Sequence, residues 1–160
     1  MKMRALFLVA VIGALLDLGA KGWARATLEP HGGAVDFMPF VSLRLTYNKG
    51  VSFGFFASTG EAPGYALILL SALVTAALAF WATRLPAAKE RLALSFILAG
   101  ALGNVIDRAT RGAVTDYLDL HFGSWHPFVF NLADVWISLG VFLLLATSVW
   151  PTRPRRGAGV

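Results

Sequence analysis

The 160-residue sequence contains no cysteine and few charged residues. Because cysteine is absent, disulfides, cysteine-ligated zinc and thiol catalysis are excluded. Charged side chains make up 14% of the chain, whereas soluble domains carry roughly 25%. The chain is instead 57% hydrophobic, and its mean hydropathy is +0.66. This composition argues against an ordinary soluble fold, a disordered chain or a coiled coil.

The few charges are unevenly divided, with 14 Lys and Arg against nine Asp and Glu and a net charge of +5. Proteins that bind nucleic acid gather such a positive balance into a basic patch on a soluble surface. In this sequence the basic residues stand at the ends of apolar runs, which is typical of a membrane protein. We therefore expect no nucleic-acid partner.

Four apolar segments are candidates for membrane helices. A bilayer core of roughly 30 Å takes about 20 helical residues to cross. We predict one membrane domain over residues 1–160, with helices at about 5–24, 62–84, 90–108 and 130–150. The alternative for the first segment is a secretory signal peptide, but Asp17 would interrupt its apolar region.

Two segments between the predicted helices are rich in strand patterns. They cover about residues 34–57 and 112–127. Residues 43–47 alternate as Leu-Arg-Leu-Thr-Tyr, and Gly123 followed by Ser124 marks a turn in the second segment. The predicted fold class is a membrane all-α bundle of four transmembrane helices with a small extracytoplasmic β-sheet.

The basic residues also predict the orientation of the chain. With the N-terminus in the cytoplasm, the short cytoplasmic segments contain Lys2, Arg4, Arg84, Lys89, Arg91, Arg153, Arg155 and Arg156. By the positive-inside rule both termini, including the tail 151–160, are then cytoplasmic. All acidic residues except Glu90 fall in outer segments or at outer helix ends. Any chemistry is therefore expected near the outer leaflet.

Acidic residues within or beside membrane spans are costly and mark candidate functional sites. Four residues meet this description, namely Asp17, Asp107, Asp116 and Asp134. Asp17 is followed four residues later by Lys21, so the two side chains share one helix face. Two explanations fit Asp17 and Lys21 equally well. They form an ion pair whose charges only neutralise each other, or they form a polar anchor beside a functional site.

Two asparagines precede acids with the same spacing. Asn104 and Asp107 are three residues apart, as are Asn131 and Asp134, so each pair points the same way on a helix. A helix cap with an acid favoured by the helix dipole is one explanation of the second pair. An interfacial ion pair between Asp107 and Arg108 is one explanation of the first. The capping explanation does not account for two polar groups on one face at the start of an apolar span.

Two carboxyl groups held close together cannot both ionise easily, so one retains a proton at neutral pH. Such a pair can activate water with one member and protonate the leaving group with the other. This chemistry requires neither a metal nor a serine or cysteine nucleophile. The spacing of the acids does not by itself identify which two form the pair.

Five motifs follow one another along the chain. They are Asp17-Leu18-Gly19-Ala20-Lys21, Asn48-Lys49-Gly50-Val51-Ser52-Phe53-Gly54, Gly100-Ala101-Leu102-Gly103-Asn104-Val105-Ile106-Asp107-Arg108, Val114-Thr115-Asp116-Tyr117 and Phe130-Asn131-Leu132-Ala133-Asp134. In this order they resemble the motifs of the lipoprotein signal peptidase (signal peptidase II) family. Two positions depart from the pattern: Leu18 stands where the family usually has Gln, and Tyr117 replaces Phe. The motifs span residues 17–134 and lie on three of the four predicted helices and in both outer segments.

The resemblance implies an intramembrane aspartic endopeptidase. Its substrate would be a prolipoprotein whose cysteine carries diacylglycerol, and the cut would fall just before that cysteine. The resemblance implies that Asp116 and Asp134 are the catalytic dyad, with Asp107 as the second candidate for a catalytic acid. The supporting and substrate-binding residues it implies are Asp17, Lys21, Asn48, Gly50, Asn104, Asp107, Arg108, Asn131 and Ala133.

The resemblance implies no cofactor and no metal. The expected partners are the prolipoprotein and membrane lipids, the expected state is a monomer, and the expected location is the bacterial cytoplasmic (inner) membrane. A serine-hydrolase pattern around Ser52 is a weaker alternative, because no helix pattern follows it and nothing places His121 or His126 beside it. A proton-coupled transporter and an assembly subunit without chemistry are the rival classes. Against the transporter, the sequence has no inverted repeat and its acids lie at one face.

Overall fold

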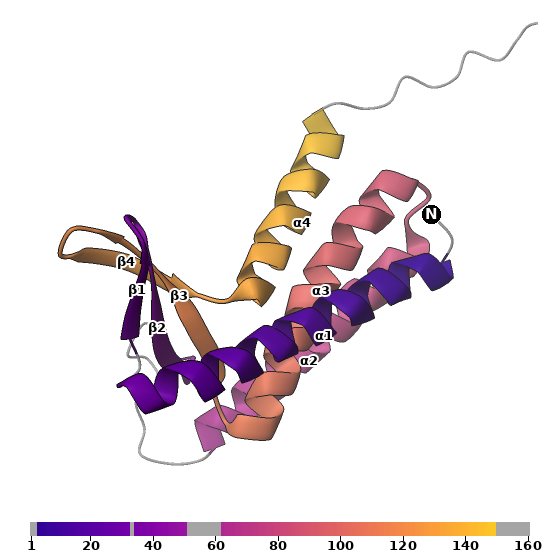
Figure 1. The fold of residues 1–160 in the computed structure, drawn as a ribbon. Helices are drawn as coiled ribbons and strands as arrows, with labels where there is room; N and C mark the ends of the chain where they lie inside the picture. The colour runs from indigo at the N-terminus through magenta and orange to yellow at the C-terminus, as the bar shows by residue number, and fades with distance from the viewer. Residues whose placement is uncertain (1–2, 33, 51–61, 150–160) are drawn as a thin grey trace, which may run out of the picture.

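The computed structural model describes residues 3–32, 34–50 and 62–149 (Figure 1). Within these residues, four helices form a bundle, and two strands after the first helix and two strands after the third helix form one antiparallel sheet. The helices are α1 (Met3–Leu28), α2 (Ala62–Arg84), α3 (Ala88–Arg111) and α4 (Leu132–Val149), with a short 3-10 helix η1 (Glu29–His31). The strands are β1 (Ala34–Met38), β2 (Val41–Asn48), β3 (Val114–Phe122) and β4 (Trp125–Phe130).

Three helices in the described part of the chain are long and apolar enough to cross a membrane. These stretches are Met3–Leu28, Gly64–Arg84 and Ala88–Arg111. The apolar stretch of α4, Leu132–Thr147, is shorter than these three. Helices with a small antiparallel sheet are therefore found as predicted, whereas the number of membrane crossings stays a prediction.

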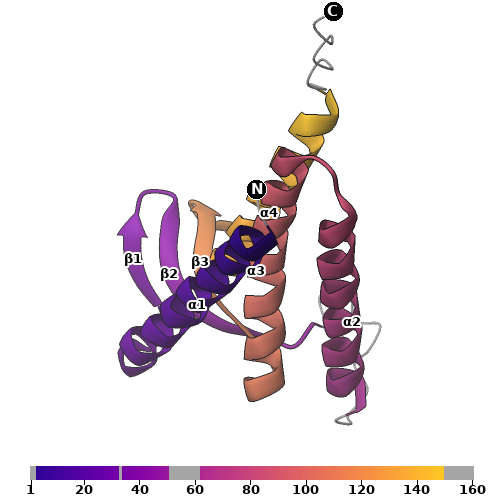
Figure 2. The ribbon, with the colours of Figure 1, turned by 90° about the vertical axis from the view of Figure 1, so that its right-hand side faces the viewer.

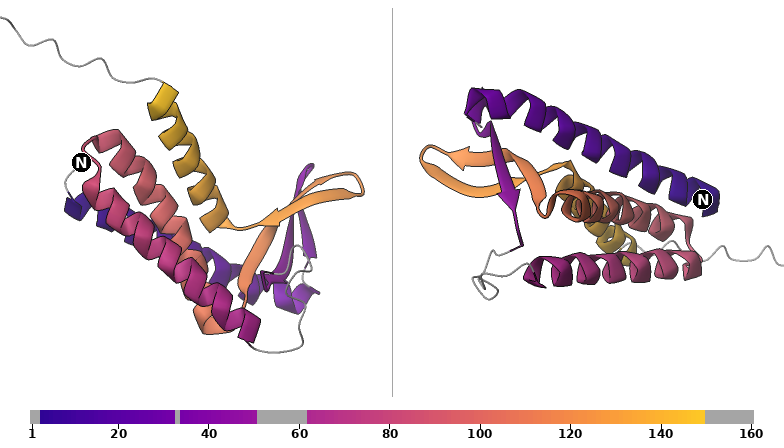
Figure 3. Two further views of the ribbon diagram at one scale, coloured as in Figure 1. Left: turned by 180° about the vertical axis from the view of Figure 1, so that it is seen from behind. Right: turned by 90° about the horizontal axis from the view of Figure 1, so that it is seen from below.

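The central helix of the bundle is α3, which packs against α1, α2 and α4. Figure 2 and the right-hand view of Figure 3 show α1 and α2 on opposite sides of it. Glycines permit the closest approaches between helices, because a Cβ at Gly100 would collide with the carbonyl oxygen of Ala133 on α4. A cluster of apolar side chains fills the far end of the bundle and contains Leu6, Ala10, Ala82, Leu94, Ile97 and Leu98.

The four strands pair in the order β1-β2-β3-β4, each antiparallel to the next. The sheet lies at the end of the bundle where α1 and α3 end and α4 begins (Figure 1). A second apolar cluster joins the sheet to α1, with Tyr117 of β3 packed against Ala24 and Leu28. Because these two α1 residues are buried beneath the sheet, the helix runs to Leu28, beyond the predicted end at residue 24.

The register of β2 against β3 is irregular beside Asp116. Leu43 pairs with Leu118 and Thr46 pairs with Asp116, so β2 carries one extra residue between these pairs. Such bulges bend a strand and re-aim the neighbouring side chains. The irregularity therefore falls where the sheet presents one of the candidate carboxyl groups.

Two predicted features lie outside the described residues. The outer segment 34–57 is described only as far as Gly50, so Ser52 and the pattern around it are not covered. The tail 151–160 is not covered either. In the described part, the N-terminal end of α1 and the C-terminal end of α4 both lie at the end of the bundle away from the sheet (Figure 1).

Candidate active site

Two asparagines connect the side chains of Asp116 and Asp134. Asn131 Nδ2 donates a hydrogen bond to Asp116 Oδ1 at 2.6 Å and another to Asn104 Oδ1 at 3.3 Å. Asn104 Nδ2 in turn donates to Asp134 Oδ1 at 3.2 Å. The two carboxyl groups therefore belong to one hydrogen-bonded network, although they come from β3 and α4.

Asn131 also caps the N-terminus of α4. The Asp134 N–H donates to Asn131 Oδ1 at 3.1 Å, and the Asn131 N–H donates to Asp134 Oδ2 at 3.1 Å. This reciprocal arrangement is the capping box of helix N-termini. The capping explanation of the Asn131–Asp134 spacing is thus correct, and the same two residues also take part in the carboxylate network.

Burial raises the pKa of Asp116 to about 6. The hydrogen bond from Asn131 lowers this pKa, the negative charge of Asp134 raises it, and a hydrogen bond from Asn48 lowers it. The side chain is 4% exposed. Desolvation therefore dominates, and Asp116 holds a proton at a higher pH than an exposed aspartate does.

Asn48 reaches Asp116 from the end of β2. Its Oδ1 accepts a hydrogen bond from the Gly50 N–H at 2.8 Å. Gly50 has a φ of +79°, in the left-handed region that favours glycine. The glycine permits the turn that orients Asn48, so both residues of this predicted motif contribute to the site.

The Asp17–Lys21 pair connects α1 to the two helices that carry the network. Both side chains are fully buried, with Lys21 Nζ 2.7 Å from Asp17 Oδ2. Asp17 Oδ1 accepts the N–H of Ala133 at 2.8 Å, and Lys21 Nζ donates to Asn104 Oδ1 at 2.7 Å. The pair is therefore more than a self-neutralising ion pair, because it reaches both α4 and α3. A Cβ at Gly103 would collide with the Asp17 carboxylate, so glycine is needed at that crossing.

Asp107 is buried near the C-terminal end of α3 and ties this helix to β3. Its Oδ2 accepts the Thr115 N–H at 2.7 Å. Lys21, Arg25 and Arg111 place cationic nitrogens 3.9, 3.4 and 3.8 Å from its carboxylate oxygens. These contacts support an anchoring role, and they differ from the Asp107–Arg108 ion pair that the sequence allowed.

Arg108 is a second cation, besides Lys21, that acts on the carboxylate network. Its guanidinium interacts electrostatically with Asp116, Asp107 and Asp134. Its Nε is buried and makes no hydrogen bond to any residue of the described chain. A donor in this position can stabilise negative charge that develops next to the two carboxyl groups.

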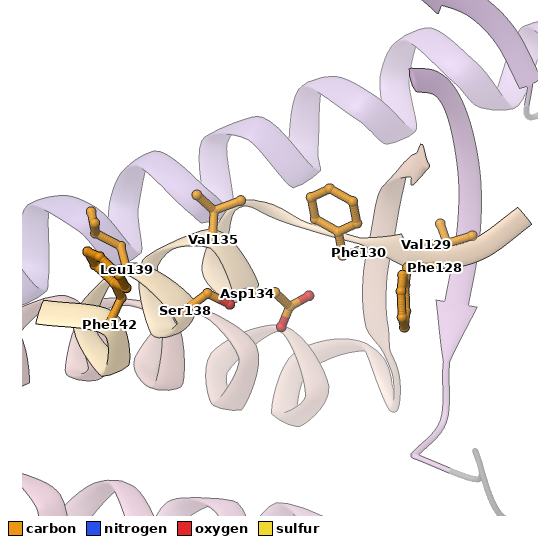
Figure 4. Close-up of a pocket in the computed structure, with 8 residues that line it drawn as sticks. All are labelled: Phe128, Val129, Phe130, Asp134, Val135, Ser138, Leu139 and Phe142. Atoms are coloured by element: carbon orange, nitrogen blue, oxygen red, sulfur yellow. The ribbon is translucent and has the colours of Figure 1, made fainter. Parts of the chain in front are cut away.

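An apolar pocket of about 620 Å³ opens beside Asp134, between β4 and α4 (Figure 4). Its lining comprises Phe128, Val129, Phe130, Asp134, Val135, Ser138, Leu139 and Phe142. Asp134 is the charged member of this lining, and the other side chains are apolar except for Ser138. The pocket can receive an apolar chain whose polar end meets a carboxylate.

The sheet contains a second, separate set of polar contacts. Asp119 is fully buried on β3, and its Oδ2 lies 2.9 Å from Arg44 Nε and 2.8 Å from His126 Nδ1. His121 contacts Ser42 at 3.0 Å. Within the ranges that the structure describes, no group of three or more His, Asp or Glu side chains is arranged to hold a metal ion.

Sequence reasoning missed Arg25 and Thr115. Arg25 Nη1 donates to Thr115 Oγ1 at 2.8 Å, next to Asp116 in the chain. The available signal is the spacing, because Arg25 follows Lys21 by four residues, as Lys21 follows Asp17. These three residues, which we call the polar row of α1, lie on one helix face.

Comparison with known proteins assigns the chain to a family. The family model described as Signal peptidase (SPase) II matches residues 9–150. The lipoprotein signal peptidase of Hydrogenovibrio crunogenus is 39% identical over 149 residues, covering 92% of this chain and 86% of that protein. The lipoprotein signal peptidase of Sphingopyxis alaskensis is 40% identical over 144 residues, covering 88% of this chain and 82% of that protein.

The fold is also similar to that of a solved membrane enzyme. A structure described as a bacterial membrane enzyme, obtained by the in meso method, has a TM-score of 0.75 and 25% sequence identity. The match covers 93% of this chain and 95% of the chain in that structure. The resemblance inferred from the five motifs is confirmed, and the chain belongs to the signal peptidase II family.

Proposed function

We propose that the protein is an aspartic endopeptidase in which Asp116 and Asp134 act together on a lipid-modified prolipoprotein. Family membership makes the chain a peptidase that removes signal peptides from lipoproteins. The aspartic mechanism and the cut before a diacylglyceryl-cysteine are our proposal. The observation that carries it is the network in which Asn131 and Asn104 connect two carboxyl groups from β3 and α4.

The two acids have different surroundings, which supports different roles. Asp134 accepts hydrogen bonds from the Asn131 N–H and the Asn104 amide, and it lines the pocket that a substrate and water can enter. Asp116 lies in a desolvated position that favours its proton. We assign Asp134 as the base that activates water and Asp116 as the acid.

The proposed reaction begins when Asp134 takes a proton from water and the water oxygen bonds to the scissile carbonyl carbon. Asp116 gives its proton to the carbonyl oxygen, which forms a neutral gem-diol. The proton on Asp134 then passes to the amine nitrogen of the cysteine, and the carbon–nitrogen bond breaks. One hydroxyl of the departing carboxylic acid returns its proton to Asp116, so both acids regain their starting states. Arg108 lies in the field of both acids and can stabilise the oxygen while its charge develops.

The apolar pocket beside Asp134 supports a lipid-modified substrate. Phe128, Phe142 and Leu139 line a space that suits a hydrocarbon chain or an apolar signal-peptide helix. The apolar helices of the bundle let such a substrate approach from within the membrane. Membrane lipids are accordingly proposed as partners along with the prolipoprotein.

The chain is a multi-pass membrane protein of this family. We propose four crossings in the bacterial inner membrane, with both termini cytoplasmic and the site near the outer leaflet. The 18 residues of α4 rise about 27 Å at 1.5 Å per residue, close to the roughly 30 Å of the hydrocarbon core. A monomer is proposed because one chain supplies both carboxyl groups of the network.

The test is cleavage of a diacylglyceryl-modified prolipoprotein by the purified full chain in detergent, followed by gel shift. We expect Asp116→Asn and Asp134→Asn each to lower kcat by at least about 1000-fold, because each removes one member of a unit. Asp107→Asn is expected to retain partial activity. The matched control is Asp119→Asn, which makes the same chemical change at a buried, ion-paired aspartate on the same strand.

The outcomes separate the rival classes. If folded Asp116→Asn cleaves the substrate at the wild-type rate, the proposed dyad is refuted. If Asp107→Asn is inactive while Asp116→Asn is active, Asp107 takes the role of the acid. Absence of cleavage by folded wild-type protein would favour a transporter or an assembly subunit. Folding of each variant is checked by its circular dichroism and its elution volume.

A further inference from the structure

The Arg25 side chain joins α1 to the strand that carries Asp116. Its Nη1 donates to Thr115 Oγ1 at 2.8 Å and to Asp107 Oδ1 at 3.4 Å. Thr115 is fully buried, and the Arg25 side chain is 15% exposed. A hydrogen bond from a charged group that is largely shielded from water constrains its acceptor strongly.

Thr115 is held through both its side chain and its backbone. Its N–H donates to Asp107 Oδ2 at 2.7 Å while its hydroxyl accepts from Arg25. Adjacent residues of a strand point to opposite faces. With Thr115 directed to α1, Asp116 is directed to the opposite face, where Asn131 binds it at 2.6 Å. A displacement of Thr115 would therefore move Asp116 relative to Asn131.

Each residue of the polar row of α1 contacts a different segment around the site. Asp17 binds the backbone next to Asp134, and Lys21 binds the asparagine of α3 that donates to Asp134. Arg25 alone in this row contacts Thr115 among the described hydrogen bonds. Asp17 and Lys21 therefore hold the Asp134 side of the network, and Arg25 holds the Asp116 side.

We propose that Arg25 is a positioning residue for the reaction, which sets the place of Asp116 opposite Asp134 through its bond to Thr115. The inference rests on the proposed function, because it gives Arg25 a role only if Asp116 is a catalytic acid. Arg25 acts through Thr115 and Asp107. Because the Arg25–Thr115 hydrogen bond can be removed at either residue, a Thr115 variant tests the same contact.

The experiment compares Arg25→Met, Thr115→Val, the double variant and Thr115→Ser as purified full chains on the same lipid-modified substrate. Arg25→Met and Thr115→Val are each expected to lower kcat between about 10- and 100-fold, because a small misplacement of a reacting group is costly. KM is expected to change by less than about twofold, since the substrate contacts remain. The double variant should be no slower than Arg25→Met, and Thr115→Ser should restore kcat because it keeps the hydroxyl.

The matched control is Arg111→Met. Arg111 Nε lies 3.8 Å from the same Asp107 oxygen, its side chain is 51% exposed, and none of its described hydrogen bonds reaches Thr115. Arg111→Met removes a positive charge near Asp107 but no hydrogen bond to Thr115, so the kcat of this variant should stay within about twofold of the wild-type kcat. An equal loss in this control would overturn the inference and assign the effect to charge near Asp107.

Three other results would also overturn the inference. The first is a wild-type kcat in Arg25→Met. The second is a double variant whose loss of kcat equals the product of the two single losses. The third is a rise in KM that accounts for the whole fall in kcat/KM. If Arg25→Met does not fold, Thr115→Val against Thr115→Ser decides the same question. Failure of the proposed function looks different, because Asp116→Asn would then cleave at the wild-type rate.

Discussion

The buried ion pair of α1 predicts a large loss of stability when only one partner is removed. Lys21 and Asp17 are both fully buried, with the ammonium nitrogen 2.7 Å from the carboxylate. Lys21→Met keeps most of the side-chain volume and removes the charge, so the change is mainly electrostatic. It leaves the Asp17 carboxylate with the Ala133 N–H as its hydrogen-bond donor. Removing one partner of a buried pair costs about 3–5 kcal/mol, which is a substantial part of a total stability of about 5–15 kcal/mol.

Unfolding by denaturant in detergent micelles, followed by circular dichroism, measures this loss. The double variant Asp17→Asn/Lys21→Met leaves no buried charge at this position, so it should recover at least half of the loss. Lys89→Met, at an exposed position of α3, is the control and should change little. A Lys21→Met loss below about 1 kcal/mol would equal that of a surface pair and would refute the reasoning. A double variant less stable than Lys21→Met would refute it too.

Two further predictions follow from the packing and the charge of the site. Gly100→Ala places a Cβ against the Ala133 carbonyl, so denaturation should show a loss of about 1–3 kcal/mol in the free energy of unfolding, together with lower activity. The control is Gly19→Ala, whose Cβ would have nothing within 4 Å, and it should keep the wild-type stability and activity. Near-wild-type activity in Gly100→Ala would contradict the close approach of α3 and α4. Because Asp116 must be protonated as the acid and its pKa is raised to about 6, kcat/KM should fall as pH rises through about 6. A flat kcat/KM profile between about pH 5 and 8 would contradict that assignment.

Local sequence patterns predicted the elements well because each pattern reports on its own segment. Long uncharged runs indicated α2 and α3, and the alternation at residues 43–47 lies within β2. The predicted end of the first helix was too early, because its last turn is buried by the sheet and not by the bundle. Burial of that kind depends on a partner that is distant in the chain.

The contacts within the site could not be predicted from local sequence patterns. Asp17 and the Ala133 N–H are 116 residues apart in the chain, so no local period relates them. The Asp17–Lys21 spacing predicted a shared face, yet it left open whether the pair neutralises itself or reaches other helices. Arg25 was overlooked because it stands outside the five motifs and its partner Thr115 is 90 residues away in the chain. The motifs identified the family, and the network assigns each residue its contacts.

The residue type at Asn131 follows from the two tasks that its side chain performs at once. As the cap of α4 it must accept the Asp134 N–H, and as the link to β3 it must donate to Asp116. A carboxylate cannot donate, and it would bring a third negative charge beside the two acids. A serine hydroxyl has one hydrogen and is too short to reach both neighbours. An amide accepts at one atom and donates at another, so a single side chain fixes the start of α4 and the position of Asp116 together. Helix capping and the geometry of the carboxylate pair are therefore the same interaction in this fold.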